Sequence, residues 1–140
     1  MDNLSKKKLL LITFLLDIFL ILNIYFNKHT ILDILWTITV IICHILFYYN
    51  LIYENRYILD ILHYFVFILP SLSLFTPNIY IKIISCFLLI LIQILWIVEK
   101  RCILNEENYK FGYGNELNYY LIIFTSLLAF NIGYIYKNSE

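Results

Sequence analysis

The sequence predicts an all-α protein: a polytopic transmembrane helical bundle with five spans, forming one integral membrane domain over residues 1–140. Composition is the first reason, because 62% of the residues are hydrophobic and only 14% are charged. Soluble domains carry about 25% charged residues, so this chain has too few to cover a surface in water. Patterning is the second reason. The apolar runs are apolar on all sides, whereas strands of a membrane barrel alternate polar and apolar residues.

Five stretches reach the length of about 20 apolar residues that a helix needs to cross a bilayer. They cover residues 9–26, 31–53, 57–75, 79–98 and 117–136. Short links join the first four, so we expect neighbouring helices to run antiparallel. Pro77 marks a turn between the third and fourth spans, and Pro70 predicts a kink within the third. A polar loop at residues 99–118 precedes the fifth span.

The basic residues predict which way the chain crosses the membrane. Lysines 6–8 precede the first span, and no small-residue cleavage site follows, which favours an uncleaved span over a signal peptide. With the N-terminus in the cytoplasm, seven of the ten basic residues face the cytoplasm and three face outward (Lys28, Lys82 and Lys137). This topology places the C-terminus outside and the 99–118 loop in the cytoplasm.

Ionisable groups inside a span are costly, so they are the first candidates for a functional site. The first span carries Asp17, and the third carries Asp60 and His63, three residues apart on one face. The fourth carries Gln93, in a register similar to that of Lys82 and Cys86. The second span carries a stripe with steps of four and seven residues, which lie on one helical face: Asp33, Thr37, His44 and Tyr48.

Four of these polar residues lie at similar depth along their helix axes. Measured from the cytoplasmic ends, Asp17, His44, His63 and Gln93 lie roughly 12, 13, 9 and 7 Å deep, at 1.5 Å per residue. We therefore predict one intramembrane cluster of Asp17, His44, Asp60, His63 and Gln93 that faces the bundle interior. Its members either satisfy one another as interhelical hydrogen bonds or form a site with its own chemistry.

The fifth span carries small residues at every fourth position: Thr125, Ala129 and Gly133. Small residues let membrane helices approach closely, so this face predicts docking onto the bundle or onto a second copy of the chain. Trp36 and Trp96, near span ends, are typical of anchors at the membrane interface.

No cofactor and no metal site is expected. The three cysteines, at positions 43, 86 and 102, form no disulfide pattern, and no His-x-x-His or Cys-x-x-Cys spacing is present. We expect Cys102 to be an unmodified thiol at the membrane interface; its two neighbouring cations make a reactive or acylated thiol the alternative. His44 and His63, on adjacent spans, leave open a haem held by two histidines.

The segment around residues 96–121 resembles an uncharacterised family of small multi-spanning membrane proteins. Members of this family carry a Cys-Pro-Leu-Thr-x-x-Glu type motif between two spans, followed by a Gly-Tyr element. Here Cys102 begins the motif, Ile103 replaces its proline, Asn105 replaces its threonine, and Glu107 lies one place before its glutamate. Gly112 and Tyr113 match the Gly-Tyr element. The resemblance implies a multi-spanning topology and an important loop, and it implies no reaction.

These observations predict a small polytopic membrane protein without enzymatic activity, acting as a structural or interaction component of a cellular or viral membrane. The expected partners are the lipid bilayer and either another membrane protein or a second copy of this chain. The zero net charge argues against nucleic acid as a partner. Transport of protons or small solutes through the Asp and His cluster is the alternative, and a haem redox protein is a third reading.

Overall fold

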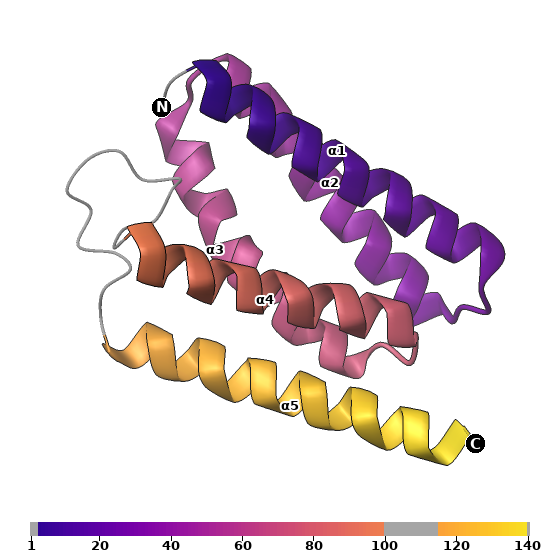
Figure 1. Cartoon of the computed structure of the whole chain (residues 1–140). Coiled ribbons are helices and arrows are strands. Elements are labelled where there is room, and N and C mark those ends of the chain that lie inside the picture. The colour runs from indigo at the N-terminus through magenta and orange to yellow at the C-terminus, as the bar shows by residue number, and fades with distance from the viewer. Residues whose placement is uncertain (1–2, 100–114, 140) are drawn as a thin grey trace.

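The computed structural model describes residues 3–99 and 115–139, and helices account for nearly all of them (Figure 1). The helices are α1 (Asn3–Phe26), α2 (Ile31–Ile52), α3 (Arg56–Leu72), α4 (Ile79–Glu99) and α5 (Asn115–Ser139). A short 3-10 helix, η1 (Ser73–Phe75), follows α3. These described ranges contain no strand. The all-α class is therefore confirmed, and each helix falls on one of the five predicted segments.

Four of the described helices are long and apolar enough to cross a membrane. The qualifying segments are Lys6–Phe26, Ile31–Ile52, Arg56–Phe75 and Tyr119–Ser139, and a shorter apolar stretch covers Ile79–Ile94. Their outward surface is hydrocarbon: Leu11 on α1 and Ile45 on α2 are each 58% exposed. Such an apolar surface suits lipid rather than water. The structure thus supports the prediction of a membrane protein.

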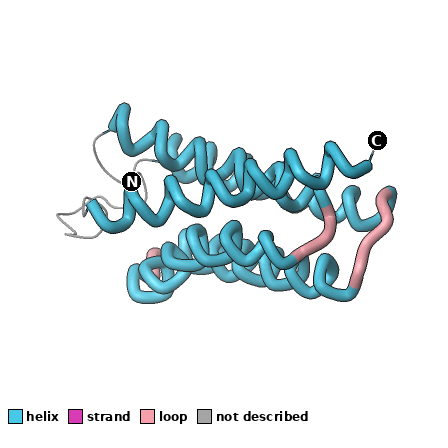
Figure 2. The backbone as a smooth tube through the Cα atoms, turned by 90° about the horizontal axis from the view of Figure 1, so that it is seen from below, coloured by secondary structure: helices cyan, strands magenta, loops and turns pink. Residues whose placement is uncertain are grey.

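The helices form two pairs that α3 connects (Figures 1 and 2). Helix α1 packs on α2, and α4 packs on α5. Helix α3 contacts α2 on one side and α4 on the other, and it also touches α5. The bundle has two ends. The N-terminal end carries the start of α1 and the α2–α3 link, and the opposite end carries the α1–α2 and α3–α4 links (Figure 1).

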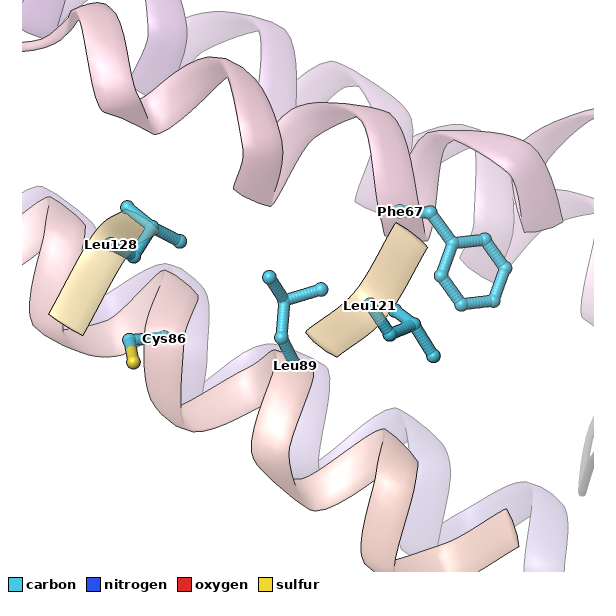
Figure 3. Close-up of a cluster of buried hydrophobic side chains, with 5 residues drawn as sticks. All are labelled: Phe67, Cys86, Leu89, Leu121 and Leu128. Atoms are coloured by element: carbon cyan, nitrogen blue, oxygen red, sulfur yellow. The ribbon is translucent and has the colours of Figure 1, made fainter. Parts of the chain in front are cut away.

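Two apolar clusters fill the contacts between helices. The first cluster joins α3, α4 and α5 through five buried residues: Phe67, Cys86, Leu89, Leu121 and Leu128. Phe67 lies beside Leu121 at one side of this cluster, and Cys86 lies beside Leu128 at the other (Figure 3). In the second, Leu20 of α1, Val40 of α2 and Leu69 of α3 pack together. Helix α3 contributes to both clusters, so it is the element that holds the two helix pairs in one bundle.

Asp33 joins the two links at the opposite end of the bundle. Its side chain is 1% exposed. Oδ2 accepts hydrogen bonds from the backbone N–H (2.7 Å) and hydroxyl (2.9 Å) of Thr30, which completes a capping box at the start of α2. Oδ1 accepts a hydrogen bond from the backbone N–H of Asn78, at 3.1 Å. One carboxylate therefore fixes the α1–α2 link against the α3–α4 link.

Asn78 and Lys82 extend this polar contact. The Asn78 side-chain oxygen accepts hydrogen bonds from the N–H groups of Tyr80 and Ile81, which caps the start of α4. Its amide group donates to the Lys28 carbonyl, at 3.4 Å. Lys82 is 2% exposed, and its Nζ donates to the Leu74 carbonyl at 2.8 Å. Asp33 attracts this ammonium electrostatically, so the two buried charges partly compensate each other.

A tight turn forms the α2–α3 link at the N-terminal end. Glu54 adopts a left-handed backbone conformation (φ 55°), and the next N–H, that of Asn55, bonds the Asn50 carbonyl at 3.0 Å. The Asn55 side chain then caps α3. Glu54 pairs with Lys6 of α1. The Lys6 ammonium holds the pKa of the Glu54 carboxyl below its usual range.

Trp36, which the sequence predicts as an interfacial anchor, packs against α3. It is half-buried, and its Nε1 donates a hydrogen bond to the Leu69 carbonyl of α3 at 2.8 Å. The Leu69 carbonyl also accepts a hydrogen bond from the backbone N–H of Ser73, so it takes part in the end of α3 as well as in the contact with α2. Helix α3 continues for only two residues past Pro70, ending at Leu72.

We predict that Asp33→Ala destabilises the bundle by about 2–4 kcal/mol, because it removes a helix cap and leaves a buried backbone N–H without an acceptor. Unfolding by sodium dodecyl sulfate, followed by circular dichroism in mixed micelles, measures this change. Thr39→Ala is the matched control, since Thr39 lies on the same helix, is exposed and bonds only its own helix. Equal unfolding midpoints for the two variants would refute the role given to Asp33.

Candidate functional site

Asp17, His44 and Tyr48 meet between α1 and α2. His44 Nδ1 lies 2.6 Å from Asp17 Oδ1, and the Tyr48 hydroxyl donates to Asp17 Oδ2 at 2.9 Å. His44 and Tyr48 are four residues apart, so they project from one face of α2 toward α1. Asp17 is 9% exposed. The structure thus brings together three of the polar residues that the sequence placed on facing spans.

The carboxylate determines which His44 nitrogen carries the proton. An ionised aspartate accepts hydrogen bonds and donates none. Since Asp17 Oδ1 accepts from His44 Nδ1, the neutral imidazole has its proton on Nδ1 and a bare lone pair on Nε2. Within the described ranges, no hydrogen bond to Nε2 is found. The cluster therefore presents a hydrogen-bond acceptor at Nε2.

His44 lies on the wall of a groove of about 530 Å³ that is lined by α1, α2, α3 and α4. Most of the wall is hydrocarbon, such as Leu16 of α1, Val40 of α2 and Phe65 of α3. The side chains with polar groups on this wall are few: Thr13, Trp36, Cys43, His44, His63 and Ser85. Asp17 and Tyr48 do not line the groove, so they support His44 from behind.

His63 of α3 lines the same groove. Its ring makes an edge contact with Phe67, with ring centroids 5.5 Å apart. His44 and His63 thus share one cavity, as the predicted cluster requires. Asp60 does not line the groove, because its side chain is exposed on α3, but its carboxylate interacts electrostatically with His63. Among the described residues, no group of three histidine, cysteine, aspartate or glutamate side chains is placed to hold a metal ion.

Gln93 belongs to the packing of α4 on α5 rather than to the histidine groove. Its Nε2 donates to Thr125 Oγ1 at 2.8 Å, and Thr125 Oγ1 donates to the Leu121 carbonyl at 2.6 Å. The Cys86 thiol also points to the Thr125 carbonyl, at 3.9 Å. The predicted cluster of five therefore holds in part: Asp17 and His44 bond each other, His63 lines the same groove as His44, and Asp60 interacts electrostatically with His63 from the exposed side of α3. Gln93 lies apart from them.

Helix α5 docks through a face that differs from the predicted one. Leu121 and Leu128 are fully buried, and with Thr125 they follow steps of four and three residues, the seam that two packed helices share. A step of four residues drifts away from this seam. Ala129 and Gly133 are accordingly exposed, and a Cβ built at Gly133 would meet no atom within 4 Å. Within the described part of the chain, Thr125 is the one predicted small residue that forms a hydrogen bond with α4.

The predicted loop site lies outside the described residues: Cys102, Asn105, Glu107, Gly112 and Tyr113. Trp96 lies on α4, in a part whose side chains are not described.

Sequence reasoning missed Ser85, which lines the groove, is 2% exposed and has a hydroxyl without a hydrogen-bond partner. Its three-residue spacing from the buried Lys82, which puts both on one face of α4, was the available signal.

Comparison with protein-family models, with curated protein sequences and with solved structures finds no match. The resemblance suggested for residues 96–121 therefore stays a prediction.

We expect Thr125→Val to lower stability by about 0.6–1.5 kcal/mol, because it leaves the Gln93 amide without its partner on α5. Ser126→Ala is the control, since Ser126 is exposed and bonds only the Ile122 carbonyl of its own helix. Unfolding in mixed micelles compares the two variants. A loss no larger for Thr125→Val than for Ser126→Ala would contradict the assignment.

Proposed function

We propose that this protein is a non-enzymatic, multi-pass interaction component of a membrane, and that it binds a lipid-soluble small molecule in the groove between α1, α2, α3 and α4. The observation that supports the proposal is the groove itself: about 530 Å³ of space in the apolar part of the bundle, with His44 on its wall. Ligand sites in proteins typically measure 300–1,000 Å³ and are apolar, with a few placed polar groups.

The size of the groove suits a small molecule. The groove volume of about 530 Å³ lies within the range of 300–1,000 Å³ that is typical of small-molecule sites. One lipid-soluble molecule would therefore occupy the groove.

The residues that line the groove also indicate the route of entry. Leu15 of α1 and Phe87 of α4 line it, and they are 56% and 63% exposed. The groove is therefore continuous with the apolar outer surface between α1 and α4. In a bilayer this opening faces hydrocarbon, so a ligand dissolved in the membrane can enter sideways without crossing water.

The basic residues support one orientation of the chain across the membrane. Of the ten basic residues, seven lie on the side of the N-terminus when the predicted segments all cross the membrane, which supports an N-terminus in the cytoplasm. The groove histidines then lie in the cytoplasmic half of the bilayer.

Proton transport is the second candidate, and the hydrogen bonds of Asp17 with His44 and Tyr48 favour it. A pathway would also need open polar groups toward the opposite end. There, Asp33 already accepts from Thr30 and Asn78, and Lys82 donates to the Leu74 carbonyl. These occupied groups argue for binding over conduction.

Leu16→Trp tests the proposal, because Leu16 lines the groove and a larger side chain would fill it. We expect native mass spectrometry of the purified protein to show one retained lipophilic molecule for the wild type and a several-fold loss for Leu16→Trp. Ile12→Trp repeats the test at a groove residue that is 57% exposed, where the new ring disturbs packing less.

Leu22→Trp is the matched control, since Leu22 lies on the same helix, is 47% exposed and does not line the groove. Its retention should equal that of the wild type. Equal retention of the lipophilic molecule by the wild type and all three variants would contradict the proposed function.

A further inference from the structure

We propose that the ligand of the groove carries a hydroxyl group on a hydrocarbon body, and that this hydroxyl donates a hydrogen bond to His44 Nε2. The inference rests on the proposed function and adds the chemical class of the ligand. Long-chain alcohols, sterols and lipophilic phenols share this chemistry, whereas simple hydrocarbons, ethers and esters do not.

The hydrogen-bond roles at His44 support this assignment. Asp17 Oδ1 lies 2.6 Å from Nδ1, and the Tyr48 hydroxyl occupies the other carboxylate oxygen at 2.9 Å. With both oxygens engaged as acceptors, the neutral ring has its proton on Nδ1 and its lone pair on Nε2. A ligand that complements Nε2 must donate. In an apolar surrounding, an acceptor left without a donor is costly, so the site selects ligands that supply one.

The rest of the wall argues for a ligand that is otherwise hydrocarbon. Leu16, Val40 and Phe65 surround the space, and a charged headgroup there would lose its hydration without a compensating charge. A single neutral hydroxyl is the polar group that Nε2 can satisfy at this depth. Ser85, buried on α4 with an unpartnered hydroxyl, adds a second polar atom on the same wall.

Asp17 is the positioning residue in this arrangement. Asp17→Asn keeps the shape of the side chain but offers an N–H₂ group that can donate to Nδ1. The imidazole proton would then move to Nε2, which becomes a donor and loses its preference for a hydroxyl over an ether. The substitution should therefore change which ligand is chosen rather than whether the groove can be occupied.

The test uses two photoactivatable probes of matched length, a diazirine-bearing hexadecanol and its methyl ether, with the full-length protein in phosphatidylcholine nanodiscs. Intact-protein mass spectrometry measures the adduct after irradiation, divided by the labelling of the bulk lipid, and peptide mapping places it. We expect the alcohol to label groove-lining residues roughly threefold to tenfold more than the ether, the effect of one hydrogen bond.

Matched variants assign the preference to His44. His44→Phe keeps an aromatic ring without the acceptor and should bring the ratio of alcohol to ether labelling to about one. Asp17→Asn should lower the ratio similarly while total labelling persists. His29→Phe is the control, because His29 is exposed in the α1–α2 link and should leave the ratio unchanged.

The outcomes separate the two proposals. Equal groove labelling by both probes, unaffected by His44→Phe, would overturn the hydroxyl inference and leave the groove as a binding site. Labelling that maps only to outward-facing residues, as expected for bulk acyl chains, would overturn both.

Discussion

The carboxylate of Asp33 is the contact on which the architecture depends. A bilayer offers no water to a buried polar group, so a partner inside the bundle stabilises such a group strongly. Asp33 meets this demand by accepting from Thr30 at the start of α2 and from Asn78 ahead of α4. Because these residues belong to two different links, the α1–α2 pair and α4 are held at one end through this polar junction. Helix α3 lies between them, and the space beside it is the groove.

The same demand explains the second carboxylate. Asp17 lies within α1 in the apolar part of the bundle, and it is satisfied by His44 and Tyr48 rather than by water. Asp33 therefore stabilises the fold, whereas Asp17 positions His44, whose side chain lines the groove. This difference is the reason for placing the candidate site at His44. Binding also accounts for a groove that is open sideways to the hydrocarbon, which a sealed conduction path would not need.

Much of the fold was predictable from the sequence, because hydrophobic length and short links set the helices and their antiparallel order. The pairing of Asp17 with His44 followed from depth and helical face. The grouping of Gln93 with the histidines was wrong, since depth along the membrane says nothing about which side of a helix meets which neighbour. The prediction that Ala129 and Gly133 lie on the docking face of α5 was wrong for a related reason. Small side chains permit close packing, but the buried leucines of α5 determine which face packs against α4. The groove itself depends on how α1 and α4 stay apart, a tertiary property that no local pattern encodes.

The central claim is that Asp17 leaves His44 with a bare Nε2 that faces the groove and receives a hydroxyl. Nitrogen-15 NMR of histidine-labelled protein in bilayers observes this directly, with the His44 signals assigned by their loss in His44→Phe. The account predicts that Nδ1 carries the proton and Nε2 carries none, and that the Nε2 resonance shifts when a long-chain alcohol is added but not when its methyl ether is added. A proton on Nε2, or an Nε2 resonance that ignores the alcohol, would contradict the account.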